Sequence, residues 1–366
     1  MDKSRINIFM ASYNHGKYIR TTIQSVLDQT FEDFVFYIYD DGSTDDSWEI
    51  IKSFKDPRIN STRKNVNTNT IDEKIVEKTL TDYVAMLHSD DFWEPTKLEK
   101  QVRFLDEHPD VGAVFTHVNV IGEDGRPLTN KSDSYYKVFD QPNRTRHEWL
   151  NFFFYNRNAL CHPSLLIRQS CYQELDYYNQ SFRQLPDLDL WVRLCFKYDI
   201  HILQERLTNF RVRAGGRNTS ADRPETHTRT EIEFLQILEH YKGLTDESEF
   251  IKVFPQAGKY FKAEGSDIVF ALAMTALEDQ TTNVSKLFGI NLLFDLFKDS
   301  NRVESIKKLY GFSLRDFHEI TGRYDIFSTI PQELIFKVKT LLRFRVIRWL
   351  VGVFSRNKNF SSSLKR

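Results

Sequence analysis

Cysteine is scarce in this chain of 366 residues, which has only Cys161, Cys171 and Cys195. Small secreted folds held by disulfides need an even set of cysteines, and cysteine-based zinc sites need closely spaced pairs. The three cysteines are odd in number and form no CxxC motif. Their scarcity therefore argues against a disulfide framework and a zinc site, and it favours a reducing, cytoplasmic setting.

Long apolar runs are missing as well. The sequence contains no stretch of about 18 uncharged apolar residues, which is the length that a membrane-spanning helix needs. The first residues, 1–5 (MDKSR), are not followed by the apolar core of a signal peptide. We therefore expect no transmembrane segment and a cytoplasmic location.

The chain also lacks an excess of one charge, because its formal net charge is -1. This value excludes the global basic field that is typical of nucleic-acid-binding proteins, so we expect no nucleic-acid partner. The balance hides an asymmetry. Residues 332–366 contain nine Lys or Arg and one acid, Glu333, for a net charge of +8, so the preceding residues sum to -9.

The first 120 residues alternate between short apolar runs and helix-like segments, a pattern that predicts a mainly parallel α/β sheet flanked by helices. We expect strands at 6–11, 34–39, 83–87 and 111–120, with a weaker one at 59–62. We expect helices at 18–27, 45–54, 71–80 and 96–107. The GxGxxG fingerprint is absent after the first expected strand, which argues against a nicotinamide-dependent enzyme.

Polar clusters follow three of the expected strands, at the sheet edge where ligands bind in open α/β folds. They are residues 12–16 (SYNHG), 40–43 (DDGS) and 88–91 (HSDD). The adjacent carboxylates of Asp90 and Asp91 fit a magnesium-type site, which combines one or two carboxylates with substrate phosphates. Because Asp is also common in turns, this pair alone is weak evidence.

Five segments together resemble family-two glycosyltransferases with the GT-A fold. The opening of the family is matched by 9–19 (FMASYNHGKYI), 25–30 (SVLDQT) and 40–45 (DDGSTD), its metal motif by 88–95 (HSDDFWEP) and its general-base segment by 186–194 (PDLDLWVRL). The match covers roughly residues 5 to 220 in the correct order. It implies inverting transfer of a sugar from a nucleotide-diphosphate donor to an acceptor hydroxyl.

The resemblance also implies roles for single residues. Tyr13 stacks on the donor base beside Ala11, and Asp41 contacts the base or ribose. Asp90 and Asp91 bind the donor and a Mn²⁺ or Mg²⁺ ion, and Asp187 takes the proton from the acceptor. General principles agree, because a cation held by carboxylates stabilises a leaving diphosphate, and one carboxylate suffices as the base of a single displacement.

The chain departs from the family pattern at two places. His88 stands where the metal motif usually begins with Asp; it either ligates the ion or points into the core, and we favour the second. Pro186 replaces the usual Glu ahead of the base, and Asp187 and Asp189 can exchange roles. We expect Asp189 to stabilise its helix and Asp187 to act as the base.

Basic and aromatic residues complete the expected site. Residues 71–73 (IDE) stand where the family often has Ala-Arg-Asn, so Arg211 and Arg213, beside a glycine-rich loop, are alternative diphosphate contacts. Ordinary solvated charges are the competing interpretation. His162 and Trp93 are candidates for the acceptor pocket, although a lone His is more often structural and Trp93 can be part of the aromatic core.

We divide the chain into a catalytic domain (1–223), a helical region of unknown role (224–331) and a basic, apolar-rich tail (332–366). The tail either docks on an anionic membrane surface, where a lipid-linked acceptor resides, or packs against the protein or a second subunit. We lean to contact at the inner face of the cell membrane, and the oligomeric state stays open.

The sequence thus predicts a metal-dependent inverting glycosyltransferase with a UDP-sugar donor, acting in surface polysaccharide or glycan synthesis. The alternatives are a non-catalytic nucleotide- or glycan-binding scaffold and a nucleotidyltransferase. The second usually needs a glycine-rich basic phosphate loop, and residues 12–18 offer little of that.

Overall fold

The structure is a computed structural model that describes residues 4–65, 81–128, 134–213, 215, 218 and 223–327. The chain forms two compact units, Met1–Thr275 and Ala276–Arg366. The first contains the sheet and the polar clusters identified in the sequence, and the second is helical in its described part. The expected helix at 71–80 and the tail 332–366 lie outside the described residues.

Four parallel strands form one half of the sheet, as the sequence predicts. They are β1 (Ile6–Ser12), β2 (Phe34–Asp40), β3 (Ile59–Arg63) and β4 (Tyr83–Met86), in the order β3-β2-β1-β4. The first five residues of β1 are buried, and so are all four of β4, because helices cover both faces of such a sheet. The register aligns Ser12 with Asp40, so the loops after β1 and β2 leave the sheet side by side.

The other half of the sheet is mixed. It contains β5 (Phe92–Trp93), β6 (Val111–Ile121), β7 (Leu166–Arg168) and β8 (Asp199–Arg211). The short β7 is inserted between β4 and β6 and runs antiparallel to both. β6 and β8 pair in parallel, and β5 pairs antiparallel with β8 at the edge. The expected mainly parallel α/β fold is thus confirmed.

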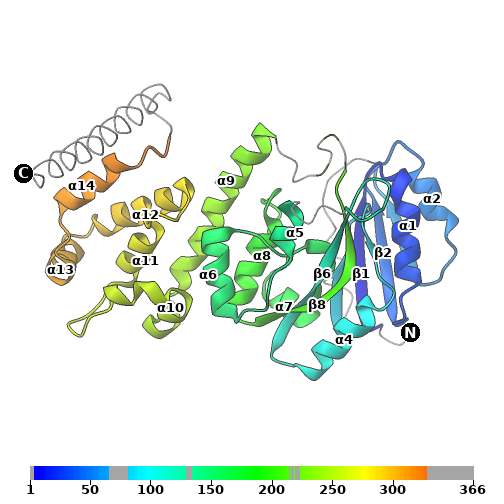
Figure 1. Cartoon of the computed structure of the whole chain (residues 1–366), viewed down its shortest axis with the longest axis horizontal. Helices are drawn as coiled ribbons and strands as arrows, with labels where there is room; N and C mark the ends of the chain where they lie inside the picture. The colour runs from blue at the N-terminus through cyan, green and yellow to red at the C-terminus, as the bar shows by residue number, and fades with distance from the viewer. Residues whose placement is uncertain are drawn as a thin grey trace, which may run out of the picture. The chain divides into compact units, whose positions relative to one another are not determined.

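Helices cover both faces of the sheet. Figure 1 shows α1 (Gly16–Leu27) and α2 (Ser47–Ser53) on one side of the strands, and α6 (Arg146–Asn156) and α8 (Pro186–Cys195) on the other. Among the described residues, the sheet region also contains α4 (Lys97–Glu107), α5 (Ser134–Phe139), η1 (His162–Ser164) and α7 (Gln169–Glu174). Helix α2 begins at Ser47 rather than at the expected Asp45, because the Asp45 carboxylate accepts the backbone N–H groups of Gly16 and Ser47.

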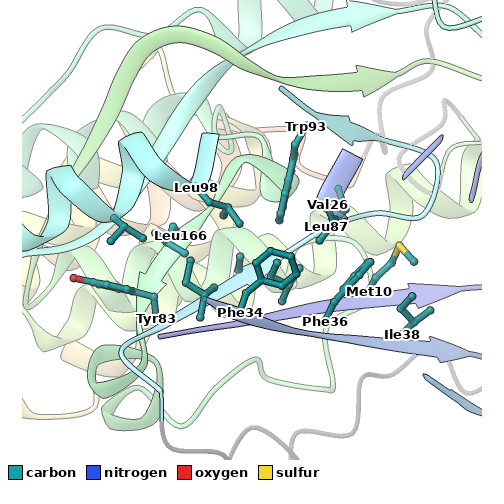
Figure 2. Packing of buried hydrophobic residues seen from close by; sticks show 14 of the residues in the cluster. Met10, Val26, Phe34, Phe36, Ile38, Tyr83, Leu87, Trp93, Leu98 and Leu166 are labelled. Carbon is teal, nitrogen blue, oxygen red and sulfur yellow. The ribbon is translucent and has the colours of Figure 1, made fainter. Parts of the chain in front are cut away.

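The main hydrophobic cluster joins the parallel strands to their covering helices. Figure 2 shows Phe34 and Phe36 of β2 near Trp93 and Leu98, which come from β5 and α4. All four side chains are buried. Burial of one such side chain contributes about 1.5–3 kcal/mol, so this cluster fixes the strands whose ends carry the site.

The region after the sheet is helical, as predicted. It contains α9 (Pro224–Glu239), η3 (His240–Gly243), α10 (Glu247–Val253), η4 (Pro255–Tyr260), α11 (Ile268–Ala276), α12 (Asn283–Leu296), α13 (Ser300–Tyr310) and α14 (Leu314–Arg323). Helices α9 and α10 belong to the same compact unit as the sheet. The functional division at residue 223 stays a prediction. Among the described residues, no helix is both long enough and apolar enough to span a membrane.

Candidate active site

The loops after β1 and β2 are joined by hydrogen bonds. The Asn14 N–H donates to Ser43 Oγ at 2.9 Å, and Asn14 Oδ1 accepts the Thr44 N–H at 2.8 Å. Asn14 has a left-handed backbone with φ of 54°, a conformation that Asn tolerates better than most residues. This local folding leaves the neighbouring Tyr13 with 41% of its surface exposed, while Ala11 inside β1 is half-buried.

The two aspartates at the carboxyl end of β2 are both buried and both paired. Asp40 Oδ1 accepts the Ser43 N–H at 3.0 Å and lies 3.3 Å from Arg63 Nε. Asp41 Oδ1 lies 3.2 Å from Lys64 Nζ. Asp40 therefore shapes the loop, and Asp41 lies beside it at the carboxyl end of the sheet.

His88, Asp90 and Asp91 form a cluster directly after β4. One potential ligand atom from each residue lies within 4.8 Å of the others. The Asp91 side chain is almost fully buried, and its Oδ2 lies 3.3 Å from His88 Nδ1. This oxygen accepts no hydrogen bond from the described part of the chain. A buried carboxylate oxygen whose described neighbour is an imidazole at ion-pair distance, beside a second carboxylate, fits a divalent cation.

The pKa values in this cluster are displaced. Burial raises the pKa of Asp91 to about 6, and the nearby Asp90 acts in the same direction. Burial lowers the pKa of His88, but the charges of Asp91, Asp90 and Asp187 outweigh it, so the pKa lies above its ordinary value. The His88 side chain is 43% exposed, so it lies in the cluster rather than in the core that we favoured for it.

The two arginines at the end of β8, Arg211 and Arg213, have different roles. Arg211 is buried, and its guanidinium donates to the backbone carbonyls of Asp90, Gly122 and Glu123. Its backbone N–H donates to Asp91 Oδ1 at 2.7 Å. Arg213 instead pairs with a side chain, because its Nε lies 3.0 Å from Asp90 Oδ2. Arg211 thus shapes the loop that carries the aspartates, whereas Arg213 places positive charge beside them.

The two aspartates of helix α8, Asp187 and Asp189, have different surroundings. Asp189 is fully buried and pairs with Arg193 and His240, each at 2.7 Å. Asp187 lies in the first turn and is half-buried. Burial raises the pKa of Asp187 to about 6, and the His88 charge opposes this rise. Asp187 therefore lies within electrostatic reach of the 88–91 cluster, while Asp189 is occupied inside the fold.

The two acceptor candidates differ in their surroundings. His162 Nδ1 lies 3.0 Å from His88 Nε2, and its Nε2 lies 2.7 Å from the Tyr178 hydroxyl. Burial, together with His88, lowers the pKa of His162 to about 3, so the ring is neutral. Trp93 is only 2% exposed, and its indole N–H donates to Pro163 O at 2.8 Å. The structure places Trp93 in the core, with almost no surface left for a sugar.

Three residues of the site were not predicted from the sequence. His15 Nε2 lies 2.6 Å from Arg213 Nη1, and because arginine only donates, His15 carries its proton on Nδ1, which faces Ser89 Oγ at 2.6 Å. Asn158 donates to Asp187 Oδ2 at 2.6 Å. Tyr178 contacts His162. The 12–16 cluster signals His15, but no local motif singles out Asn158 or Tyr178.

Comparison with known proteins shows which family this sequence resembles. The family model described as "Glycosyl transferase family 2" matches residues 7–172. The uncharacterized glycosyltransferase MJ1057 of Methanocaldococcus jannaschii is 30% identical over 219 residues, which are 58% of this chain and 72% of the relative. An Escherichia coli protein, the UDP-Glc:alpha-D-GlcNAc-diphosphoundecaprenol beta-1,3-glucosyltransferase WfaP, is 35% identical over 103 residues, which span 28% of this chain and only 41% of the relative.

A solved structure shares the fold. S. aureus TarS 1-349, crystallised in complex with UDP-GlcNAc, superposes with a TM-score of 0.54 at 14% identity, covering 84% of this chain and 91% of that one. Such low identity establishes only the architecture, which is that of GT-A glycosyltransferases. The family is shown by the sequence matches, namely the family model over residues 7–172 and the relative that is 30% identical. This chain therefore belongs to glycosyl transferase family 2 and is a glycosyltransferase.

Proposed function

We propose that this protein moves a sugar from a nucleotide-diphosphate donor to an acceptor hydroxyl with inversion, in a reaction that depends on Mn²⁺ or Mg²⁺. One observation carries the proposal. The His88, Asp90 and Asp91 cluster lies within electrostatic reach of the half-buried Asp187, whose pKa is raised to about 6. A cation site for the diphosphate and a carboxylate base are the two groups that this chemistry needs.

Asp91 and Asp90 are the proposed metal ligands, and His88 is placed to assist. The buried Asp91 Oδ2 is paired with the His88 imidazole at 3.3 Å but accepts no well-aligned hydrogen bond from the described residues, so an ion bound between the two side chains would satisfy it. When bound, the cation neutralises charge that develops on the leaving diphosphate. Asp90 pairs with Arg213, and we propose that this guanidinium contacts the diphosphate once the carboxylate has another partner.

The donor nucleotide is proposed to lie over the ends of β1 and β2. Tyr13 is exposed there and presents a ring on which a base can stack, and Ala11 precedes it by two residues in β1. Asp41, which follows β2 and pairs with Lys64, is proposed to accept hydrogen bonds from the base or ribose. The name of the relative WfaP supports UDP as the nucleotide. We assign Arg211 a supporting role, because the bonds that its guanidinium makes are to backbone carbonyls.

Asp187 is the proposed general base. As the acceptor oxygen attacks the anomeric carbon, its proton passes to the Asp187 carboxylate while the bond from that carbon to the diphosphate oxygen breaks. A pKa of about 6 suits this role, because the group is ionised near neutral pH and still basic enough to take a proton. His162, neutral and beside His88, is proposed to face the acceptor.

The acceptor is proposed to be a glycan, in particular a lipid-linked sugar, in the synthesis of a surface polysaccharide. The WfaP name, which includes a diphosphoundecaprenol-linked sugar, supports a lipid-linked acceptor. Such an acceptor resides at a membrane surface, and residues 332–366 carry the net charge of +8 that anionic lipid attracts. Liposome flotation of the full chain against a version that ends at Pro331 tests this contact; equal flotation of both overturns it.

Asp187→Asn tests the reaction. Replacing the base should reduce transfer about 10²- to 10⁴-fold while donor binding persists, because the amide keeps the shape but cannot accept the proton. Sugar transfer and nucleotide binding would be measured on the same preparation. Retained turnover, or loss of nucleotide binding together with activity, would remove Asp187 from the role of base.

A further inference from the structure

Both carboxylate oxygens of Asp187 accept a hydrogen bond. Oδ1 accepts the backbone N–H of Leu188 at 2.8 Å, which comes from the same helix turn. Oδ2 accepts from the Asn158 side-chain amide at 2.6 Å, across 29 positions of sequence. The second bond is therefore the one that ties the carboxylate to another element of the fold.

The orientation of the Asn158 amide is fixed by its other end. Asn158 Oδ1 accepts the backbone N–H of Leu160 at 3.0 Å. A flipped amide would place its oxygen against Asp187 Oδ2 and its NH₂ group against the Leu160 N–H, and both contacts would be repulsive. The NH₂ group is therefore held toward Asp187.

The backbone before Asn158 is strained. Arg157 ends helix α6 with φ of 65° and ψ of -152°, a region that is almost restricted to glycine and costs about 1–3 kcal/mol for other residues. Helix α9 holds this conformation, since the Arg157 guanidinium lies 2.7 Å from Glu231 Oε2 and 4.6 Å from the Phe234 ring centre. Strain of this kind persists where the surroundings impose it, which typically occurs at functional sites.

Helix α9 also holds the segment that precedes Asp187 in the chain. Glu233 is buried and accepts three backbone N–H groups, those of Arg183, Gln184 and Leu185, at 2.8–2.9 Å. These residues lead directly into Pro186 and Asp187 at the start of α8. The same helix thus fixes the segment that carries Asp187 and the segment that carries Asn158.

We infer that Asn158 is a positioning residue that orients the Asp187 carboxylate toward the acceptor hydroxyl, and that the strained Arg157 and helix α9 set its place. The inference rests on the proposed role of Asp187 as the base. A donor on Oδ2 stabilises the ionised carboxylate and leaves its remaining lone pairs for the incoming proton. Among the described residues on neighbouring segments, the charge of His88 acts on this carboxylate, and the carboxylate in turn helps to raise the pKa of the buried Cys161 thiol.

The experiment measures the ionisation of Asp187 directly, by carbon-13 NMR of protein labelled at the aspartate carboxyl carbons. The signal is assigned by its loss in Asp187→Asn. In Asn158→Ala the titration midpoint should rise by about one pH unit, because the ionised form loses a charge-assisted hydrogen bond. The control is Asn156→Ala, since Asn156 is exposed and donates to Phe152 O rather than to the site. Its midpoint should equal that of the wild type.

A midpoint in Asn158→Ala equal to the wild type would overturn the inference. If this variant does not fold, Asn158→Asp keeps the shape of the side chain and replaces the donor by a like charge. Its expected result is again a raised Asp187 midpoint, and an unchanged one would again overturn the inference.

Turnover separates this inference from the proposed function. Release of UDP from UDP-glucose and UDP-N-acetylglucosamine with Mn²⁺ would be followed from pH 5 to 9. In Asn158→Ala, the midpoint of the acid limb of the kcat–pH profile should shift to higher pH, and KM should stay unchanged. Wild-type turnover in Asp187→Asn would refute the base, and the positioning role with it. If Asp187→Asn is inactive but the Asp187 midpoint and the kcat–pH profile of Asn158→Ala equal those of the wild type, only the positioning role is refuted.

Discussion

Asp187 and Asp189 are two residues apart on helix α8, yet their environments move their pKa values in opposite directions. Burial raises the pKa of Asp187 to about 6. Burial acts in the same direction on Asp189, but His240 and Arg193 outweigh it and hold the pKa of that carboxyl below its ordinary value. Such divergence between neighbouring carboxylates typically separates a reacting group from a structural one.

This divergence predicts opposite effects on stability. A carboxylate whose pKa is raised on folding destabilises the protein as the pH rises from about 4 to 6, and the loss is complete above pH 6. At pH 8, Asp187→Asn should therefore raise the free energy of unfolding by about 1–2 kcal/mol and the melting temperature by a few degrees. At pH 4 it should change both quantities little.

Asp189→Asn is the matched control for this effect. A lowered pKa stabilises the fold above the ordinary pKa of aspartate, so this substitution should lower the melting temperature at pH 8. Thermal unfolding of both variants at the two pH values measures the difference. A destabilised Asp187→Asn at pH 8 would show that the raised pKa of Asp187 has been assigned wrongly.

At the scale of elements, helix α9 holds the segment before α8 through Glu233. Glu233→Gln should lower kcat several-fold and destabilise the fold by about 1–3 kcal/mol, because an amide has one acceptor oxygen for three N–H donors. Donor KM should change little, since Glu233 contacts none of the residues proposed for the donor. The kinetics and thermal unfolding of Glu233→Gln would be compared with those of Glu239→Gln. Glu239 is an exposed residue of the same helix and pairs with Lys242. Equal behaviour of the two variants would contradict the role of Glu233.

The elements that the sequence predicts well are those with a strong local pattern. Strands β1 and β2 are apolar runs bounded by polar residues, and α4 follows Thr96 with an apolar face. Strands β5 and β7 have only two and three residues, so no periodicity can reveal them. Their place in the sheet is set by pairing with β8, β4 and β6, which are distant in sequence.

The same limit applies to the site. Asp40, Asp41, Asp90 and Asp91 follow strands and can be found by motif, and the structure places all four at the carboxyl ends of β2 and β4. Asn158 and Glu233 act through partners 29 and about 50 positions away, and a single polar residue carries no mark of such a contact. Trp93 shows the converse case, because its neighbour Asp91 lies in the site while its own side chain lies in the core.

For the whole molecule, the first compact unit extends to Thr275. It includes α9, whose Phe234, Ile237 and Leu238 are buried. We expect a chain that ends at Thr275 to fold and bind nucleotide. A chain that ends at residue 223 should fail to fold, because it loses these side chains and Glu233. Circular dichroism and nucleotide binding of the two versions test this; a stable, binding chain of 223 residues would show that α9 is dispensable.

The central claim is that residues 88–91 form a cation-dependent nucleotide site, and thermal shift with UDP, with and without Mn²⁺, tests it most directly. At 100 times its dissociation constant, a ligand adds about 2.7 kcal/mol to the stability of the native state. We predict that UDP raises the melting temperature by about 5–10 °C only when Mn²⁺ is present, and that Asp91→Ala abolishes the rise. The same shift with and without Mn²⁺, or in Asp91→Ala, would contradict the account.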